Sequence, residues 1–488
     1  MINELYCNIL MIPYIKKGFE NMDTFIFTIT AIIELAVFFV FGYFFFISIF
    51  GLYKKKDDGA EKCVPEKNFA MIVAAHNEDV VIANIIESLN ALDYPRDLYD
   101  IMIIADNCID NTASIARSHD GAMVFERNVP DNKGKGYALE WMFDKIFNME
   151  KKYDAICIFD ADNLIEGNFL KEMNYKLKSG YKVVQGYLDS KNPHDSWVTE
   201  CYAISYWSSN RLYQLGRNNL RLSNQIGGTG FCMDTEVLKQ LGWGATCLTE
   251  DLEFTCKLVM NGEKVGWAHN AIIYDEKPLT MKQSWHQRKR WMQGFSDVSS
   301  RYFFKLMKKA IKDKDFVAFD CAMYTTQPFM YVALGITGLL TLLQINADQG
   351  LSIFVVSALF APWVWKTISI FQFLFTPIVV GLEGQLSKKM IGVFALFSLN
   401  VILFPLVFGD HAVLMTVVAA NVLYFLTFAA ALFIVDRKNS LKTFIRYLLF
   451  GVYTLTWIPI GIQGIMDRNK KEWSHTQHTR QISINEMD

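Results

Sequence analysis

The chain has 488 residues, of which 52% are hydrophobic and 14% aromatic, and this apolar content is high for a water-soluble protein of its length. Its net charge of -2 argues against a nucleic-acid-binding protein, because neutralising phosphates needs a concentrated surplus of Lys and Arg. The nine cysteines include no CxxC pair, so neither a disulfide framework nor a zinc site is expected.

The first apolar run covers residues 24–50 and contains a single charged residue, Glu34. It is long enough to cross a hydrocarbon core, which needs about 20 helical residues. The three lysines at 54–56 follow directly, and by the positive-inside rule they place the next segment in the cytoplasm and residues 1–23 outside. We therefore expect a transmembrane helix over residues 24–53, and not a cleaved signal peptide.

Strand-like and helix-like patterns alternate from residue 57 to about residue 315. The apolar runs at 69–75, 100–106, 122–127 and 154–160 have the length of buried strands, and the segments 80–92, 112–118 and 135–149 have helical spacing. This alternation predicts a mostly parallel sheet covered by helices on both faces. In such sheets ligands bind at the carboxyl ends of the strands.

Polar side chains follow three of these strands at that edge. His76 and Glu78 come after the first strand, Asp106 ends the second, and Asp160 and Asp162 end the fourth. In an extended chain Asp160 and Asp162 point to the same side, and two close carboxylates repel unless a cation or proton lies between them. A divalent cation that also binds phosphate oxygens fits the pair, although a lone DxD also occurs in ordinary loops.

Two further segments place charged groups at predicted helix starts. Lys133 and Lys135 lie among glycines before a helix, where they suit a phosphate, although a solvated turn has the same pattern. Thr249 precedes a helical pattern whose first turn holds Glu250 and Asp251, and an ordinary N-cap also explains this arrangement.

The segment 286–295 places Gln287, Arg290 and Trp291 on one face of a helix. An amide, a guanidinium and an aromatic ring side by side suit a pyrophosphate and a sugar. An amphipathic helix on the membrane surface is the alternative interpretation.

Apolar runs resume after Lys314, at about 317–345, 351–382, 390–408, 412–435 and 443–465. Five crossings would leave the basic tail outside, against the charge rule. We therefore expect four crossings. The run that does not cross is either 351–382 or 443–465.

Asp106, the DAD at 160–162, the TED at 249–251 and the QRKRW at 287–291 resemble, in this order, the motifs of the membrane-integrated, processive polysaccharide synthases of glycosyltransferase family 2. That group holds the cellulose, hyaluronan, chitin and poly-N-acetylglucosamine synthases, and the resemblance covers about residues 68–300. It implies an α/β GT-A fold, Rossmann-like and mostly parallel, embedded in an α-helical transmembrane bundle. The implied parts are an extracellular segment (1–23), a transmembrane helix (24–53), a cytosolic catalytic domain (57–278), interfacial helices (279–315), a transmembrane polymer channel (316–466) and a cytosolic tail (467–488).

The resemblance also implies roles for individual residues. The residues of the UDP-sugar site would be Ala74, His76, Glu78, Asp106, Lys133, Lys135, Asp160, Gln287 and Arg290. Asp160 and Asp162 would hold Mg²⁺ or Mn²⁺. Asp251 would be the general base, with Glu250 beside it, and the acceptor would meet Trp291, Gly228, Thr229 and Gly230.

The expected function is that of an inverting, processive enzyme of the plasma membrane. It would polymerise a UDP-sugar, UDP-glucose before UDP-N-acetylglucosamine, into a β-linked polysaccharide that crosses the bilayer. Its partners are thus the donor, the growing polysaccharide and the lipid bilayer, and not nucleic acid. The alternatives are transfer of one sugar to a lipid, or a transporter or receptor with an inactive domain. The basic tail at 472–480 is expected to fold back on the cytosolic domain.

Overall fold

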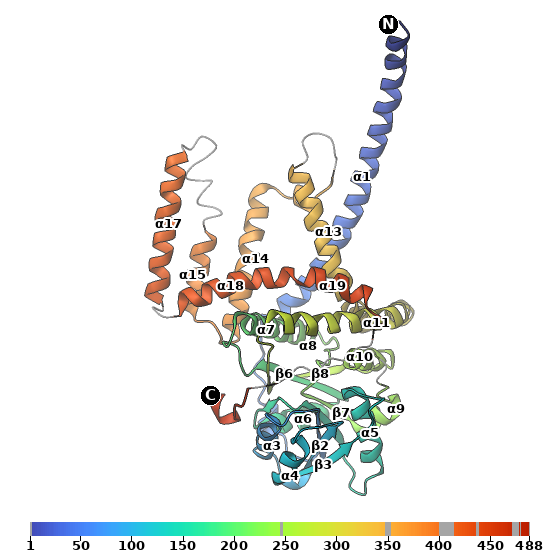
Figure 1. The fold of residues 1–488 in the computed structure, drawn as a ribbon, viewed down its shortest axis with the longest axis vertical. Helices are drawn as coiled ribbons and strands as arrows, with labels where there is room; N and C mark the ends of the chain where they lie inside the picture. Colours follow the sequence, from blue (N-terminus) through green and yellow to red (C-terminus); the bar gives the residue numbers. More distant parts are fainter. Residues whose placement is uncertain are drawn as a thin grey trace. The chain divides into compact units, whose positions relative to one another are not determined.

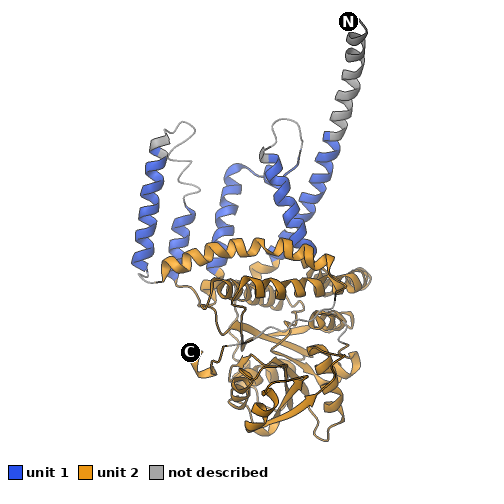
Figure 2. Cartoon of the chain, viewed as in Figure 1, with its two compact units in different colours: residues 1–46, 329–378, 388–435 blue, residues 47–328, 379–387, 436–488 orange. Residues whose placement is uncertain are grey.

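The computed structural model describes residues 2–244, 247–346, 353–399, 414–435, 439–470, 478 and 480–487. The chain divides into two compact units (Figure 2). The first comprises Met1–Phe46, Phe329–Ile378 and Lys388–Val435, and the second comprises Ile47–Pro328, Val379–Ser387 and Asp436–Asp488. The second unit contains every residue of the site expected from the sequence.

An eight-stranded sheet forms the centre of the second unit, and Figure 1 labels several of its strands. The strand order is β3-β2-β1-β4-β7-β6-β8-β5. Its strands are β1 (Phe69–Ala75), β2 (Tyr99–Asp106), β3 (Ala122–Arg127), β4 (Ala155–Asp160), β5 (Leu164–Ile165), β6 (Val183–Ser190), β7 (Phe231–Asp234) and β8 (Val265–Asp275). The four strands expected from the sequence are β1 to β4, and they are confirmed. These four pair in parallel, whereas β7 runs antiparallel to β4 and β6, and β5 runs antiparallel to β8.

The register of β1 brings the expected ligand edge together. β1 pairs with β2 on one side and with β4 on the other, so Ala74 lies opposite both Ile104 and Asp160. The loops that leave the carboxyl ends of these three strands therefore start side by side.

Alternate residues of β1 enter two separate cores, as the two-residue period of a strand requires. Phe69, Met71 and Val73 pack with α3 (Ile82–Asn90), α4 (Thr112–Ser118) and α6 (Phe169–Lys178). Ala70 and Ile72 pack with α5 (Lys135–Asn148), α9 (Thr235–Leu241) and α10 (Glu250–Met260). The sheet is buried on both faces, which explains why its first strands read as continuous apolar runs.

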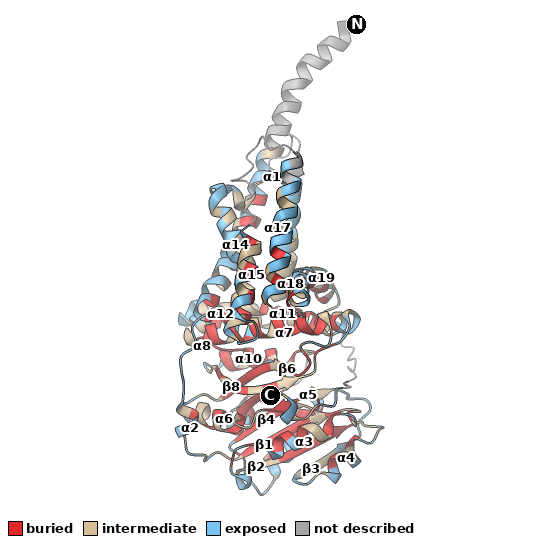
Figure 3. Cartoon of the chain, turned by 90° about the vertical axis from the view of Figure 1, so that its left-hand side faces the viewer, coloured by how far each residue is buried: buried red, intermediate tan, exposed pale blue. Residues whose placement is uncertain are grey.

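The unit also contains α2 (Gly59–Lys62), α7 (Trp197–Ser208), α8 (Gly216–Asn219), α11 (Met281–Asp313), α12 (Phe316–Thr325), α18 (Ser440–Leu455) and α19 (Trp457–Met466). The π-helix Ser209–Leu215 connects α7 to α8. Short 3-10 turns lie at Arg96–Leu98 and Ile484–Glu486. The long helix α11 begins with a capping box between Thr280 and Gln283. It ends at Lys314, whose left-handed conformation (φ 53°) turns the chain into α12. One buried cluster joins α10, α11 and α12, and Figure 3 shows this burial.

The described residues include five helices long and apolar enough to cross a membrane. These are Asp23–Phe50 within α1 (Ile2–Phe50), Gln327–Gln344 within α13 (Gln327–Asn346), α14 (Pro362–Leu382), Val418–Val435 within α17 (Leu414–Val435), and Ser440–Met466 across α18 and α19. Large apolar side chains of the first unit lie exposed, among them Phe39 and Leu423, as expected of lipid-facing helices. The helix α1 also includes most of the segment 1–23, which the sequence had left without a secondary structure.

The apolar runs after Lys314 differ from their expected bounds. The run 317–345 breaks at Thr326, and its first part, α12, belongs to the second unit. The run 351–382 holds the 3-10 turn Val356–Leu359 and then α14, and the run 443–465 divides at Thr456. Of the run 390–408, residues 400–408 lie outside the described part of the chain, and residues 390–398 belong to α15 (Lys388–Ser398).

Candidate functional site

Asp160 lies at the end of β4 and faces a lysine from the start of α5. Lys135 Nζ donates a hydrogen bond to Asp160 Oδ1 at 2.5 Å and another to the carbonyl oxygen of Gly228 at 2.7 Å. The Asp160 side chain is 41% exposed, so it remains open to a ligand. Lys135 thus joins the end of β4 to the loop at 227–230, instead of pointing to a separate phosphate site.

Asp162 lies in the turn after β4 and is buried. Its Oδ2 accepts the Glu276 backbone N–H at 2.8 Å and lies 4.0 Å from Nε2 of His478. Lys191 Nζ donates to the Asp162 carbonyl oxygen at 2.9 Å. Burial alone would raise the pKa of Asp162, but the charges of His478 and Lys191 hold that pKa below its usual value, so the carboxylate is ionised at neutral pH.

The prediction that Asp160 and Asp162 both lie on an extended chain was wrong. The alternation of side chains applies to an extended chain, but β4 ends at Asp160 and residues 161–162 form a turn. Each aspartate instead meets its own cationic side chain, Lys135 or His478.

Asp160 and Asp162 fit a divalent cation only if the substrate supplies further ligands. Within the described residues, no three acidic, histidine or cysteine side chains converge as a metal site. Asp160 and Asp162 offer hard carboxylate oxygens, and cationic groups already lie against both. Mg²⁺ characteristically takes one or two carboxylates, with phosphate and water as its remaining ligands, and this pair matches that pattern.

The loop after β1 carries the next expected residues. His76 Nδ1 lies 2.6 Å from the carbonyl oxygen of Asp106, which joins the ends of β1 and β2. The Glu78 carboxylate is buried and lies 3.0 and 3.1 Å from Nδ1 of His478. Asn77 between them has a left-handed conformation (φ 56°), which turns this loop sharply after Ala74 and Ala75.

Asp106 is engaged by a partner that the sequence analysis missed. Arg127, the last residue of β3, donates to Asp106 Oδ1 at 2.6 Å, and both side chains are buried. Asn107 donates to the same oxygen at 2.9 Å. The sequence could have predicted this ion pair, because Arg127 is a basic residue at the end of the expected strand next to the one that ends at Asp106.

The TED motif begins α10 as expected, with Glu250 and Asp251 in the first turn. The Thr249 side chain makes no capping hydrogen bond, so the ordinary N-cap interpretation is not supported. Asp251 has some access to solvent but lies deep among protein atoms, and this burial, followed by the charge of Glu250, raises the pKa of Asp251 to about 7. Burial also raises the pKa of Glu250.

The glycine loop approaches Asp251 closely. A Cβ atom at Gly228 would lie 3.4 Å from Asp251 Oδ2, and the positive φ values of Gly228 (83°) and Gly230 (62°) favour glycine. Thr229 donates to Asn163 Oδ1 at 2.5 Å, and the Gly230 N–H donates to the Ile158 carbonyl oxygen at 2.8 Å. The loop is therefore fixed to β4 on one side and faces Asp251 on the other.

The QRKRW segment lies in the first third of α11. Tyr202 donates to Gln287 Oε1 at 2.7 Å, and the Trp291 ring stacks on Trp457 with ring centres 6.5 Å apart and an interplanar angle of 19°. The positive charge of Arg290 opposes the rise in the pKa of Glu250, so Arg290 lies near the start of α10. Of these residues Arg290 is thus linked to the TED motif, whereas Gln287 and Trp291 contact α7 and α19.

Arg288, in the middle of the same motif, has a packing role. It is fully buried, with its guanidinium 4.1 Å from the ring centre of Tyr453 and 4.8 Å from that of Trp457, and it donates to Thr456 Oγ1 at 2.9 Å. By contrast, Lys133 is exposed in the turn before α5, so Lys135 alone of the two lysines joins the other site residues.

The described tail residues contact this site. Besides the contacts of His478, the Arg480 N–H donates to Glu276 Oε2 at 3.1 Å, and its carbonyl oxygen accepts from Lys191 at 3.2 Å. For His478 and Arg480 the expected return of the tail to the domain of the central sheet is confirmed; residues 471–477 and 479 lie outside the described part of the chain.

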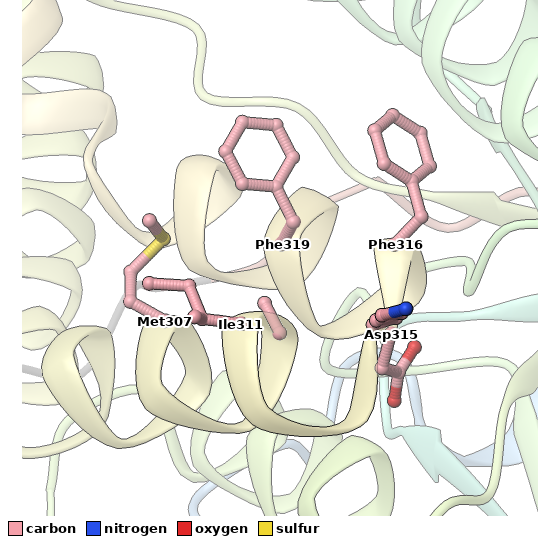
Figure 4. A pocket seen from close by; sticks show the side chains of 7 residues that line it. Met307, Ile311, Asp315, Phe316 and Phe319 are labelled. Atoms are coloured by element: carbon pink, nitrogen blue, oxygen red, sulfur yellow. The ribbon is translucent and has the colours of Figure 1, made fainter.

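One surface hollow lies apart from these residues. It measures about 330 Å³ at the corner between α11 and α12, and Figure 4 shows Met307, Ile311, Phe316 and Phe319 around it. None of the expected site residues lines it.

Comparisons with known proteins match part of the chain, including the central sheet. The family described as "Glycosyltransferase like family 2" matches residues 65–294. The chain is 28% identical over 247 residues to the beta-monoglucosyldiacylglycerol synthase of Synechocystis, which covers 48% of this chain and 49% of that protein. It is 26% identical over 287 residues to the poly-beta-1,6-N-acetyl-D-glucosamine synthase of Staphylococcus aureus, which covers 56% of this chain and 66% of that protein.

Among solved structures, a mannosyltransferase from Pyrobaculum calidifontis in complex with GDP-Man and Mn²⁺ aligns with a TM-score of 0.49 at 16% identity, over 76% of this chain and 98% of that one. The chain thus spans only part of the length of either curated relative, about half of the first.

Proposed function

We propose that the domain at residues 65–294, which matches the family described as "Glycosyltransferase like family 2", transfers a hexosyl group from a UDP-sugar to an acceptor hydroxyl with inversion at the anomeric carbon. The match to a glycosyltransferase family supports this activity, and the central sheet is mixed, where the sequence predicted a mostly parallel one. The relatives differ in their acceptors, so the identities of donor and acceptor belong to the proposal.

The observation that carries the proposal is the environment of Asp251. A carboxylate is an effective general base when its pKa lies near the working pH, and burial raises the pKa of Asp251 to about 7. Asp251 also faces the glycine loop at 228–230, where a sugar hydroxyl can approach the backbone closely.

In this mechanism Asp251 removes the proton from the acceptor hydroxyl as its oxygen attacks the anomeric carbon. A new bond forms between that carbon and the acceptor oxygen, and the bond to the diphosphate oxygen breaks on the opposite face, so UDP leaves with the bonding electron pair. A single displacement converts an α-linked donor into a β-linked product. Trp291, stacked on Trp457, offers a ring face for the acceptor sugar.

The donor side uses the groups at the strand ends. Ala74, His76, Glu78 and Asp106 would border the nucleotide, and Lys135, Gln287 and Arg290 would orient the diphosphate. Asp160 and Asp162 would hold Mg²⁺ or Mn²⁺, which would supply positive charge to stabilise the departing diphosphate. Lys135 keeps Asp160 directed toward the Gly228 loop, and so keeps the donor side next to the acceptor side.

For the acceptor we propose a growing β-linked glucan made from UDP-glucose, with UDP-N-acetylglucosamine as the alternative donor. The similarity to a poly-beta-1,6-N-acetyl-D-glucosamine synthase supports polymer formation. The five helices long and apolar enough to span a membrane support export through the plasma membrane from a cytosolic catalytic domain. A hydroxyl-rich polymer needs such a lined path, because its polar groups would be unsatisfied in hydrocarbon.

A second candidate is transfer of one glucosyl group to a diacylglycerol-like lipid. The similarity to a beta-monoglucosyldiacylglycerol synthase favours it. The same base and donor site would serve, with a lipid hydroxyl in place of the sugar hydroxyl.

The full chain in lipid nanodiscs separates these functions. It is incubated with radiolabelled UDP-glucose or UDP-N-acetylglucosamine, Mn²⁺, and nanodiscs with or without diacylglycerol. A ladder of products that does not depend on diacylglycerol supports the polymer, and a single labelled lipid supports the second candidate. If neither sugar is transferred, or if Asp251→Asn retains its product yield, the proposed function is wrong.

A further inference from the structure

Two direct contacts join α10 to α11, one on each side of the proposed base. Thr249, two residues before Asp251, packs on Gly294 of α11. Glu253, two residues after Asp251, pairs with Arg301 of α11. Asp251 therefore lies between two contacts that hold α10 against α11.

The first contact depends on the absence of a side chain at position 294. A Cβ atom there would lie 2.4 Å from both Oγ1 and Cγ2 of Thr249 and 2.8 Å from its Cβ, where ordinary contacts begin near 3.4 Å. Thr249 and Gly294 are both buried, and the Thr249 atoms in question branch directly from its Cβ. The backbone of α11 thus touches the residue just before α10. A larger residue at 294 must displace Thr249, and turning its side chain does not relieve the 2.8 Å approach of its Cβ, so part of the shift falls on the two helices.

The second contact is a two-pronged ion pair. Arg301 Nη1 and Nη2 donate to Glu253 Oε1 and Oε2 at 2.8 and 3.1 Å. The Glu253 side chain is 4% exposed, Tyr302 donates to its Oε1 at 3.4 Å, and Asp297 lies 3.2 Å from the same arginine. A bidentate arginine–carboxylate pair fixes direction as well as distance.

Both contacts come from the stripe of α11 that begins with Arg290. Residues 290, 294, 297 and 301 follow the i, i+4, i+7, i+11 spacing of one helical face. Arg290 at the start of this stripe acts electrostatically on Glu250, which adjoins the base. The buried cluster of α10 and α11 side chains, including Leu252 and Val298, fills the space between the two contacts.

We propose that Gly294 with Thr249, and Arg301 with Glu253, are positioning residues that hold the general base Asp251 in fixed register with Arg290 and Trp291. The inference rests on the proposed function, because it takes Asp251 as the base. None of the four touches the reacting atoms. They act by keeping the helix that carries the base from sliding along the helix that carries the diphosphate and acceptor residues.

The decisive variant is Gly294→Ala in the full chain. A displacement of about 1 Å at a reacting group can cost on the order of 100-fold in rate, so kcat should fall by about that factor. The KM for the UDP-sugar and the affinity for UDP should stay near the parental values. Removing the opposing atoms with Thr249→Ala in the same chain should restore part of kcat.

Gly266→Ala is the matched control. A Cβ there would lie 2.7 Å from Cγ of the half-buried Tyr181 ring. This is a comparable clash at the start of β8, the end of the strand opposite the site. It should lower the melting temperature while leaving kcat per folded molecule unchanged. Arg301→Lys keeps the charge but loses the second hydrogen bond, so it should lower kcat less than Gly294→Ala and again leave KM unchanged.

The outcomes distinguish this inference from the proposed function. If Asp251→Asn is inactive but Gly294→Ala keeps the parental kcat, the positioning role is refuted and the base assignment stands. If Gly294→Ala weakens UDP binding in parallel with kcat, or if Thr249→Ala gives no rescue, position 294 is structural only and the inference is refuted. If Asp251→Asn remains active, the proposed function itself fails.

Discussion

Asp251→Asn should stabilise the folded protein while it abolishes transfer, because the carboxyl is held in an unfavourable environment. Burial, then the charge of Glu250, raises the pKa of Asp251 from 3.8 to about 7. The protonated form is thus favoured in the folded state. Its contribution to stability is complete below pH 3.8 and is lost as the pH rises through 7.

The size of the effect follows from that difference in pKa. At about 1.36 kcal/mol per pKa unit, the ionised carboxyl costs at most about 4 kcal/mol above pH 7. Water that reaches the partly exposed side chain screens part of this cost, so the observed value should be smaller. Melting temperatures move by roughly 2–4 °C per kcal/mol for a domain of about 200 residues, so Asp251→Asn should melt several degrees above the parental chain at pH 8.

The assay is thermal unfolding of both chains in the same detergent, from pH 5 to pH 8. The gap in melting temperature should widen as the pH rises toward 7 and then stay constant. Asp120→Asn, at an exposed position, is the control and should show no such gap. An Asp251→Asn chain that melts at or below the parental temperature at pH 8 would refute the claim that this carboxyl is destabilised by burial.

Three further outcomes are expected at the site. Lys135→Met removes a charge that lowers the pKa of Asp251, so the acid limb of the kcat/KM profile should move to higher pH, and a limb that stays in place would show that Lys135 does not act on the base. His478→Ala removes the cationic side chain that lies against Asp162, so half-maximal Mn²⁺ binding in the presence of UDP, measured by calorimetry, should need less Mn²⁺; a need for more would mean that the histidine itself helps to hold the cation. Arg127→Met leaves a buried carboxylate without its ion-pair partner and should cost about 3–5 kcal/mol of stability, and an unchanged melting curve would contradict the buried pair.

The local pattern of the sequence was enough to place the acids of the site. Asp106 and Asp160 end apolar strands, and Asp251 lies in the first turn of an amphipathic helix. Hydrophobic periodicity and the signals that mark the ends of strands and helices therefore located all three. The parallel strands β1 to β4 were equally visible, because each is a continuous apolar run. The strand β7 has four residues and gave no such signal.

The partners of these acids could not be found in the same way. His478 lies 400 positions along the chain from Glu78, and no short-range pattern connects them. Gly294 lies three residues after the QRKRW motif, within the segment 286–295, and no local pattern marks it, because its importance depends on how closely α10 packs. Long-range packing, not local propensity, decides which basic group meets which acid.

This division explains which of the acids can bind a ligand. Asp106 and Arg127 are both nearly inaccessible, with side chains 6% and 5% exposed, so displacing either would leave a buried charge uncompensated. Asp160 is 41% exposed and its partner Lys135 is held also by the Gly228 carbonyl oxygen, so the lysine can keep one hydrogen bond when a cation or phosphate enters. In the proposed mechanism Asp160 is therefore the strand-end acid that can exchange its partner during turnover, and Asp106 keeps its partner.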